Sequence, residues 1–300
     1  MSIDTMTKID SGERVGKYRI LRIIHPGASA AVYEVEHEGT GQQFALKMLL
    51  QSGSESREAR RAFAFEARMG MELRHPNLMK VHEYIKDEGL PYFVMDYFPS
   101  FNLRVPITRA WAPPYSRTQL HRILTLSATA LAYLHDHGWV HRDVKPENII
   151  ANRSGEVRVI DYALAKRISG GFRSLFTSKP PREGTRTYIS PEQIRREPPA
   201  VSADIYSFGI TCYELTCGRP PFRANSSQEL LNKHLAERAI PLTTHNNLVT
   251  PEFNELVMKM IQKKPKERPE SLHEFLSRFR TIRIFQDDPA PQASRGMGLA

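Results

Sequence analysis

Cysteines and long apolar runs are scarce in this sequence. The 300 residues include only two cysteines, Cys212 and Cys217, and both lie in an apolar segment with helical character. A lone pair of cysteines without further ligands favours core positions over a disulfide or a metal site, and it indicates a reducing compartment. No segment reaches the roughly 20 apolar residues of a membrane span, and no charged-then-apolar leader opens the chain. We therefore expect a cytoplasmic protein without a membrane span.

The positive charge lacks the clustering that is typical of nucleic-acid-binding proteins. The net charge is +9, but the basic residues are spread over separate segments, among them 57–61, 195–196 and 263–266. The sequence has no RNA-module signature, no zinc-finger spacing and no internal repeat. These features favour a basic surface that accepts anionic ligands and acidic partners over a nucleic-acid function. No feature indicates an oligomeric state.

Hydrophobic periodicity divides the chain into two unlike parts. Strands are predicted over 18–24, 31–35, 44–47, 78–85 and 92–97, with a helix over 56–73. After Pro113-Pro114 the pattern is mainly helical, with helices predicted over 119–138, 204–216, 226–237, 251–262 and 270–280. The polar segments 1–16 and 282–300 are expected to be disordered. The sequence thus predicts an α+β protein with a small antiparallel sheet lobe over 17–97 and a larger helical lobe over 98–281.

A polar segment in the middle of the chain carries the groups that phosphoryl transfer needs. That reaction requires positioning, oxygen ligands for metal ions, cations on the phosphates and a carboxylate near the attacking hydroxyl. Within the run His-Arg-Asp-Val-Lys-Pro-Glu-Asn over 141–148, Asp143 is the candidate base and Lys145 would place a charge beside the transferred phosphate. Asn148 and the later Asp161 supply the hard oxygen ligands that Mg²⁺ prefers.

A lysine and a glutamate in the first part complete this set. Lys47 lies on the third predicted strand, where it can reach the α- and β-phosphates of ATP. Glu66 follows on the predicted helix and can hold Lys47 in an ion pair. Each residue alone is weak evidence, because an isolated surface pair contributes little. The joint order of Lys, Glu, HRD-x-K-x-x-N and Asp is very specific.

These residues identify a resemblance to the protein kinase family, from about residue 18 to 280. Asp161-Tyr162-Ala163 stands at the DFG triplet, Ser190-Pro191-Glu192 at the APE triplet, and 204–209 at the D-x-W-S-x-G segment. Arg268 falls at the buried arginine that pairs with Glu192 in the family. The resemblance implies the two-lobed kinase fold, with ATP and Mg²⁺ as cofactors and a protein hydroxyl as the acceptor.

The resemblance also implies which residues contact the nucleotide. Met95 would be the gatekeeper, Asp96 to Phe98 would form the adenine hinge, and Asn102 would contact the ribose. The remaining implied contacts come from apolar or small residues of both parts: Ile24, Gly27, Val32, Ala45 and Ile150.

The acceptor class follows from two further features. Lys145 and the run Gly184-Thr185-Arg186-Thr187-Tyr188 resemble Ser/Thr kinases rather than tyrosine kinases, and Thr185 is expected to hydrogen-bond Asp143 and Lys145. The short Ser-Pro-Glu-Gln run and the compact second lobe are similar to bacterial members of the family.

Three positions depart from the family pattern. The glycine-rich loop retains only Gly27, because His25 and Ala30 occupy the other glycine positions. A side chain limits how closely backbone amides approach phosphate, so we expect weak ATP binding with a Michaelis constant toward the millimolar end. Ala163 is expected to restrict the DFG switch. Gly70 is expected to leave a gap in the apolar column beside Tyr162 and to cost roughly 1 kcal/mol of helix stability.

Two alternatives to an active protein kinase follow from these departures. A pseudokinase would use the same fold as a binding or scaffold module, since fold alone does not confer activity. A small-molecule kinase fits less well, because the complete APE-type segment suits a polypeptide groove. If the chain is active, Arg142 implies regulation by a phosphorylated activation segment, and the candidate sites are Ser169, Ser174, Thr177 and Ser178, with Thr177 favoured.

Overall fold

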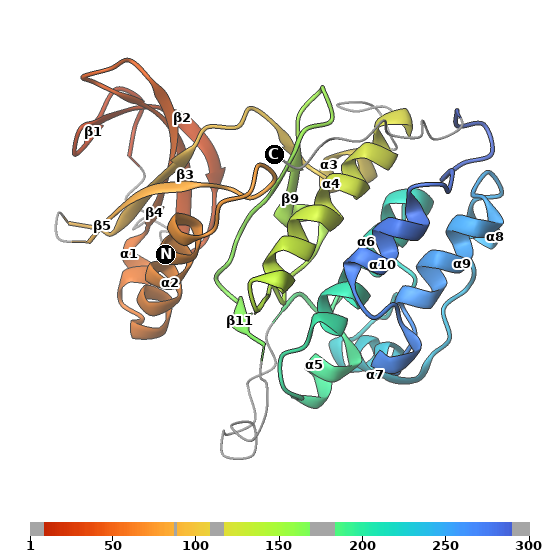
Figure 1. The fold of residues 1–300 in the computed structure, drawn as a ribbon. Helices are drawn as coiled ribbons and strands as arrows, with labels where there is room; N and C mark the ends of the chain where they lie inside the picture. Colours follow the sequence, from red (N-terminus) through yellow and green to blue (C-terminus); the bar gives the residue numbers. More distant parts are fainter. Residues whose placement is uncertain (1–8, 87–88, 109–116, 169–183, 290–300) are drawn as a thin grey trace. The chain divides into compact units, whose positions relative to one another are not determined.

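The computed structural model describes residues 9–86, 89–108, 117–168 and 184–289. The chain forms two compact units (Figure 1). One contains the chain up to Pro99 together with Asp161–Ala163, and the other contains Ser100–Ile160 and the chain from Leu164 onward. The predicted α+β architecture is confirmed, with a sheet in the first unit and mainly helices in the second. The short return of Asp161–Ala163 to the first unit is a feature that periodicity does not predict.

The first unit is built on a six-stranded antiparallel sheet with the order β1-β2-β3-β4-β6-β5. Its strands are β1 (Arg14–Val15), β2 (Tyr18–Pro26), β3 (Ala30–His37), β4 (Gln43–Leu49), β5 (Val81–Ile85) and β6 (Tyr92–Asp96). One face is closed by side chains that are fully removed from water, including Tyr33, Val35, Leu46 and Val94. These buried positions fix the register of the strands, because a slip by one residue would move their side chains off the core face.

Two helices follow β4, namely α1 (Gln51–Ser54) and α2 (Arg57–Glu72). Ser56 begins α2 by accepting a hydrogen bond from the amide of Ala59 on its side-chain oxygen. The buried residues of α2 include Phe63, Glu66 and Gly70, whose spacing places them on one helical face. That face therefore carries one carboxylate among apolar groups.

The predicted gap at Gly70 is wrong. A Cβ at position 70 would lie 2.4 Å from Cγ2 of Val81, so the glycine lets α2 pack directly against β5. Val81 already fills the space that a larger side chain on the helix would occupy.

The second unit is mainly helical (Figure 1). Its α-helices are α3 (Arg104–Thr108), α4 (Arg117–Asp136), α5 (Pro191–Arg195), α6 (Val201–Cys217), α7 (Ser227–Ala236), α8 (Leu242–His245), α9 (Pro251–Met260) and α10 (Leu272–Phe279). Its short strands and 3-10 turns are β7 (Phe101–Asn102), β8 (Trp139–Val140), η1 (Pro146–Asn148), β9 (Ile149–Ala151), β10 (Val157–Val159), β11 (Lys166–Arg167) and η3 (Pro265–Glu267). Helix α6 is buried along nearly its whole length and ends at Gly218 in a left-handed conformation, as the sequence predicts.

The packed chain extends beyond the predicted limits of 17 and 281. At the amino end, Arg14 and Val15 pair with β2 as strand β1. At the carboxy end, Ile284 and Phe285 are buried, and the amide of Thr250 donates to the carbonyl of Ile284. These two apolar residues follow α10 too closely to produce a periodic signal of their own, which is why the sequence pattern assigned them to a tail.

Among the helices that the structure describes, none has the length and apolar character that crossing a membrane requires.

Candidate active site

In the first unit, Lys47 and Glu66 form a close ion pair. Nζ of Lys47 donates to both carboxylate oxygens of Glu66, at 2.7 and 2.8 Å. Lys47 lies on β4, and Glu66 is the one carboxylate on the buried face of α2, so each charge compensates the desolvation of the other. The predicted pair is therefore present.

Burial and neighbouring charges shift the pKa values of both residues of this pair. Burial alone would lower the pKa of Lys47, but the charges of Glu66 and Asp161 outweigh it and hold this pKa above its ordinary value. Burial raises the pKa of Glu66 to about 6, although the charge of Lys47 opposes this shift. Lys47 is thus charged at neutral pH, and the carboxylate of Asp161 in the same unit contributes to this.

Asp161 is held in an unusual backbone conformation. Its φ of 68° lies in the left-handed region, which costs free energy in a residue other than glycine. The next residue anchors this conformation, because the buried hydroxyl of Tyr162 accepts a hydrogen bond of 3.0 Å from the amide of Met79. The segment Asp161–Ala163 therefore packs into the first unit through Tyr162. The carboxylate of Asp161 lies close enough to Lys47 to shift its pKa.

In the second unit, the segment over 141–148 is shaped by a buried aspartate on α6. The carboxylate of Asp204 accepts hydrogen bonds from the amides of His141, at 2.7 Å, and Arg142, at 2.8 Å. Arg142 has a φ of 70°, and these two bonds hold it there. Burial would raise the pKa of Asp204, but His135 at 2.9 Å and the backbone amides hold it below its ordinary value.

Asp143 lies at the centre of the second polar group. Its Oδ2 accepts from Nζ of Lys145 at 2.6 Å and from Nδ2 of Asn148 at 3.1 Å. Its Oδ1 accepts from the amide and the hydroxyl of Thr185, at 2.9 and 3.0 Å. Burial would raise the pKa of Asp143, but the charge of Lys145 and the Thr185 amide bond hold it below its ordinary value. Asp143 is therefore an ionised, fully oriented carboxylate at neutral pH.

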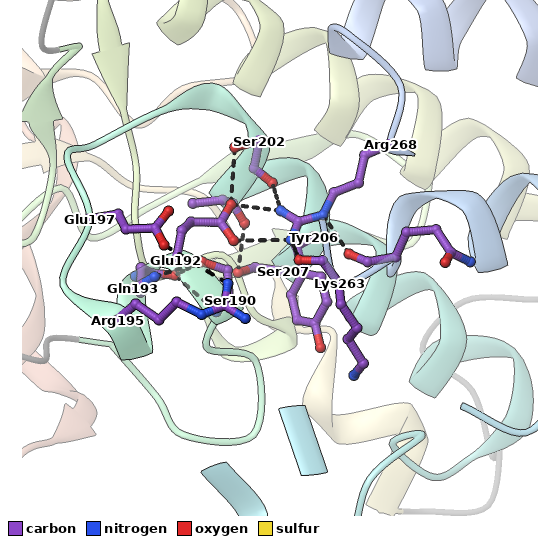
Figure 2. A network of polar contacts seen from close by, with 12 residues as sticks. Ser190, Glu192, Gln193, Arg195, Glu197, Ser202, Tyr206, Ser207, Lys263 and Arg268 are labelled. Carbon is purple, nitrogen blue, oxygen red and sulfur yellow. Dashed lines mark hydrogen bonds and ion pairs between the residues drawn. The ribbon is translucent and has the colours of Figure 1, made fainter. Parts of the chain in front are cut away.

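The segment that carries Thr185 is fastened to the helical core by a buried ion pair (Figure 2). The guanidinium of Arg268 donates to both oxygens of Glu192, at 2.6 and 3.0 Å, and Ser202 donates its hydroxyl to the same carboxylate. The predicted pairing of Arg268 with Glu192 is confirmed. Because Glu192 lies in the first turn of α5, this pair fixes the end of the segment that starts at Thr185.

Comparison with known proteins identifies the family to which the chain belongs. The family model of the protein kinase domain matches residues 18–278. The chain belongs to the protein kinase family. It is 31% identical over 271 residues to the serine/threonine-protein kinase PrkC of Bacillus subtilis, covering 90% of this chain and 41% of the relative. It is 30% identical over 283 residues to the serine/threonine-protein kinase PknB of Mycolicibacterium smegmatis, covering 93% and 44%. The chain thus spans less than half the length of these relatives.

The nucleotide-contact positions that the kinase resemblance implies in the sheet lie on adjacent strands. Val32 is on β3 and Ala45 on β4, and Ala45 is directly opposite Met95 on β6. Ile24, near the end of β2, is 41% exposed, which is high for a large aliphatic residue. These side chains remain predicted contacts of the adenine ring.

The hinge and ribose positions have partners of their own. The carboxylate of Asp96 is 2.6 Å from Nε2 of His82, and Phe98 is half-buried just beyond β6. In the second unit, Asn102 on β7 is paired with Ile150 on β9. Oδ1 of Asn102 accepts from the backbone amide of Arg104, the first residue of α3, and this bond orients the side chain that the resemblance assigns to the ribose.

Gly27 is required by the geometry of residues 25–30, which we call the phosphate loop because the kinase resemblance implies that they would cover the phosphates of ATP. A Cβ at position 27 would lie 2.3 Å from the carbonyl oxygen of Ala30, so any side chain would force the turn open. His25 and Pro26 belong to β2 and pair with β3, which leaves only residues 27–29 as the turn. The loop thus needs its one remaining glycine to close.

Several positioning residues escaped the sequence analysis. The role of Asp204 could have been inferred only from its place in the D-x-W-S-x-G segment. Gln193 donates from Nε2 to the carbonyl of Arg142, at 2.9 Å, and Gly184 has a φ of 106° where a Cβ would lie 3.0 Å from that carbonyl. Both contacts join residues far apart in the chain, so no local pattern indicates them. The predicted phosphorylation sites Ser169, Ser174, Thr177 and Ser178 lie outside the described residues.

Proposed function

We propose that this chain is the catalytic domain of a Ser/Thr protein kinase, which transfers the γ-phosphate of ATP to hydroxyl groups of protein substrates. The observation that carries the proposal is the position of Lys145, whose Nζ donates to Asp143 and, at 2.7 Å, to the hydroxyl of Thr185. A carboxylate, a cation and a threonine are thereby held together where an acceptor hydroxyl and a phosphate would meet. The relatives named as serine/threonine-protein kinases support the same acceptor class.

Asn148 in the second unit and Asp161 in the first carry the kind of oxygen atoms that would bind a magnesium ion arriving with ATP. Asn148 uses its amide nitrogen to bind Oδ2 and the carbonyl of Asp143, which leaves its amide oxygen as a ligand. Asp161 contributes a carboxylate, and magnesium sites in kinases combine one or two such ligands with phosphate oxygens. Bound magnesium supplies positive charge that neutralises the phosphates. Lys47, fixed by Glu66, would add its cation to the α- and β-phosphates.

Asp143 orients the acceptor hydroxyl in this proposal. Because its pKa is held low, it is ionised and accepts a hydrogen bond from the hydroxyl, which directs the oxygen at the phosphorus atom. As the hydroxyl oxygen bonds to the γ-phosphorus, the bond from that phosphorus to the β–γ bridging oxygen breaks and ADP leaves with the electron pair, while the hydroxyl proton passes to Asp143. Lys145 stabilises the negative charge on the group in transfer, and Thr185 holds the carboxylate against rotation.

The test is magnesium-dependent incorporation of labelled phosphate into the chain itself and into a generic basic protein, with Asp161→Ala as the control. We expect transfer by the wild type that is lost in the control and absent with chelator. ATP binding without any transfer would support the pseudokinase alternative. The intact ion pair of Lys47 and the ordered Asp143 favour activity over that alternative.

The two cysteines support a reducing, cytoplasmic setting for the domain. Both thiols are free, and burial raises the pKa of Cys217 to about 11. A thiol with such a pKa is protonated and unreactive at neutral pH.

A further inference from the structure

The turn of the phosphate loop is fastened to the short helix α1. The hydroxyl of Ser52 donates to the carbonyl of Ala28 at 3.0 Å, and the amide of Leu50 donates to the carbonyl of Ser29 at 2.9 Å. Gly53 is buried against the same turn, and a Cβ there would lie 2.5 Å from the carbonyl oxygen of Ser29. Two hydrogen bonds and one close backbone approach therefore join residues 28–29 to 50–53, within the first unit.

These contacts set the direction in which the backbone carbonyls of the turn point. The carbonyls of Ala28 and Ser29 are both directed at α1. In the described part of the chain, the amides of Gly27, Ala28 and Ser29 donate no hydrogen bond of their own. Successive backbone amides in a turn can form the concave nests that bind anions. In a trans peptide the amide points opposite to the carbonyl, so the amide of Ser29 is directed away from α1 and can donate to a phosphate there.

We propose that α1 is a clasp that holds the phosphate loop in its ATP-binding arrangement, with Ser52 and Gly53 as positioning residues for the phosphates of ATP. The proposal rests on the proposed kinase function. Two of the three glycine positions of the loop hold His25 and Ala30, so the loop has less freedom to close around phosphate unaided. The clasp also keeps the turn in register with β4, because Leu50 directly follows the strand that carries Lys47.

The experiment measures nucleotide binding by direct titration of the purified chain with MgATP and with adenosine. Ser52→Ala removes the hydroxyl donor and is expected to weaken MgATP binding roughly three- to tenfold, as the loss of one hydrogen bond implies. Ser52→Thr retains the donor and should bind like the wild type. Gly53→Ala forces α1 and Ser29 apart and should weaken MgATP more than Ser52→Ala does. Adenosine lacks phosphates, so its affinity should stay unchanged in every variant.

Two controls match the substitutions. Gln51→Ala alters an exposed side chain on the same helix, and Gly39→Ala adds a methyl group in an exposed turn of the same unit, where its nearest neighbour is the end of the His37 ring. Both should bind MgATP like the wild type. The thermal unfolding of each variant is also measured, so that a loss of folding can be distinguished from a loss of affinity for MgATP.

The outcomes separate the clasp from the kinase function. Unchanged MgATP affinity in folded Ser52→Ala and Gly53→Ala would overturn the clasp, and so would an equal loss of adenosine affinity, since α1 would then act on the whole unit. A wild type that binds MgATP but transfers no phosphate would overturn the proposed activity alone, because the clasp is decided by the binding of phosphates.

Discussion

Gly70 of α2 and Val81 of β5 are in such close contact that position 70 has no room for a side chain. A Cβ there would lie 2.4 Å from Cγ2 and 3.1 Å from Cβ of Val81. The glycine thus sets the distance between the helix that carries Glu66 and the sheet that carries Lys47. This packing requires a glycine, although the same residue in an exposed helix would cost stability.

We therefore expect Gly70→Ala to destabilise the protein. Overpacking costs typically 1–3 kcal/mol, and this exceeds the gain of about 1 kcal/mol in helix propensity. The measurement is the free energy of unfolding in denaturant for Gly70→Ala, Val81→Ala and the double variant. The alanine at 70 should cost less in the Val81→Ala background, where the colliding methyl groups are gone. A Gly70→Ala variant more stable than the wild type would contradict the assigned role.

Lys47→Met is expected to leave the fold intact and to remove most phosphotransfer. The substitution keeps the aliphatic stem on β4 but removes the cation that Glu66 holds at 2.7 Å. The lost charge should cost several kcal/mol of transition-state stabilisation, which lowers kcat/KM by about a thousandfold or more. Circular dichroism checks the fold, and Lys80→Met provides the control, since Lys80 is an exposed lysine of the same unit. Comparable turnover by Lys47→Met and the wild type would refute the assignment.

The sequence predicts the contacts among the candidate catalytic residues well, because the order and spacing of these residues follow the family pattern. Lys47 and Glu66 lie on a strand and a helix that periodicity predicts, and they form the expected ion pair in the first unit. In the second unit, Asp143 contacts Lys145 and Thr185, as the sequence also predicts. Helix α6 could also be predicted, since Gly218 marks its end.

The contacts that position these residues could not be predicted in the same way. Asp204 acts on His141 and Arg142 from more than sixty positions away, and Ser52 reaches Ala28 from another element. Such bonds depend on tertiary packing and leave no local pattern of charge or periodicity. Gly70 was misjudged for the same reason, because its role is visible only once Val81 is placed against it.

Arg268→Ala should destabilise the second unit strongly. Both side chains of the Arg268–Glu192 pair are almost fully buried, so the substitution leaves a carboxylate without its main partner. Breaking a buried pair in this way costs about 3–5 kcal/mol. The matched control is Lys264→Ala, which removes an exposed pair with Glu267 and should change stability by less than about 1 kcal/mol. Thermal and denaturant unfolding measure both variants, and equal losses would refute the structural role of the buried pair.

The buried histidine of α7 should make the stability of the protein depend on pH. His234 packs against the rings of Tyr206 and Phe222, and its Nδ1 lies 2.9 Å from the Tyr206 hydroxyl. Burial, with a smaller contribution from the charge of Lys263, lowers the pKa of His234 to about 3. In the unfolded chain this histidine has an ordinary pKa of about 6.5. Between about pH 3 and pH 6.5 it is therefore protonated in the unfolded chain and neutral in the folded chain. The stability from this group is therefore complete above pH 6.5 and falls as the pH drops toward 3.

This proton linkage is tested with His234→Asn, which keeps a polar group near the Tyr206 hydroxyl but does not titrate. The free energy of unfolding is measured from pH 7.5 to pH 4 for the wild type and the variant, and the difference is compared across pH. The wild type should lose up to about 1.4 kcal/mol per pH unit more than the variant below pH 6.5. Burial also lowers the pKa of Lys263, to about 8, but the linkage of an amine with that pKa acts between about pH 8 and 10.5, outside this window. Parallel pH profiles for the two proteins would show that His234 is not held neutral by the fold.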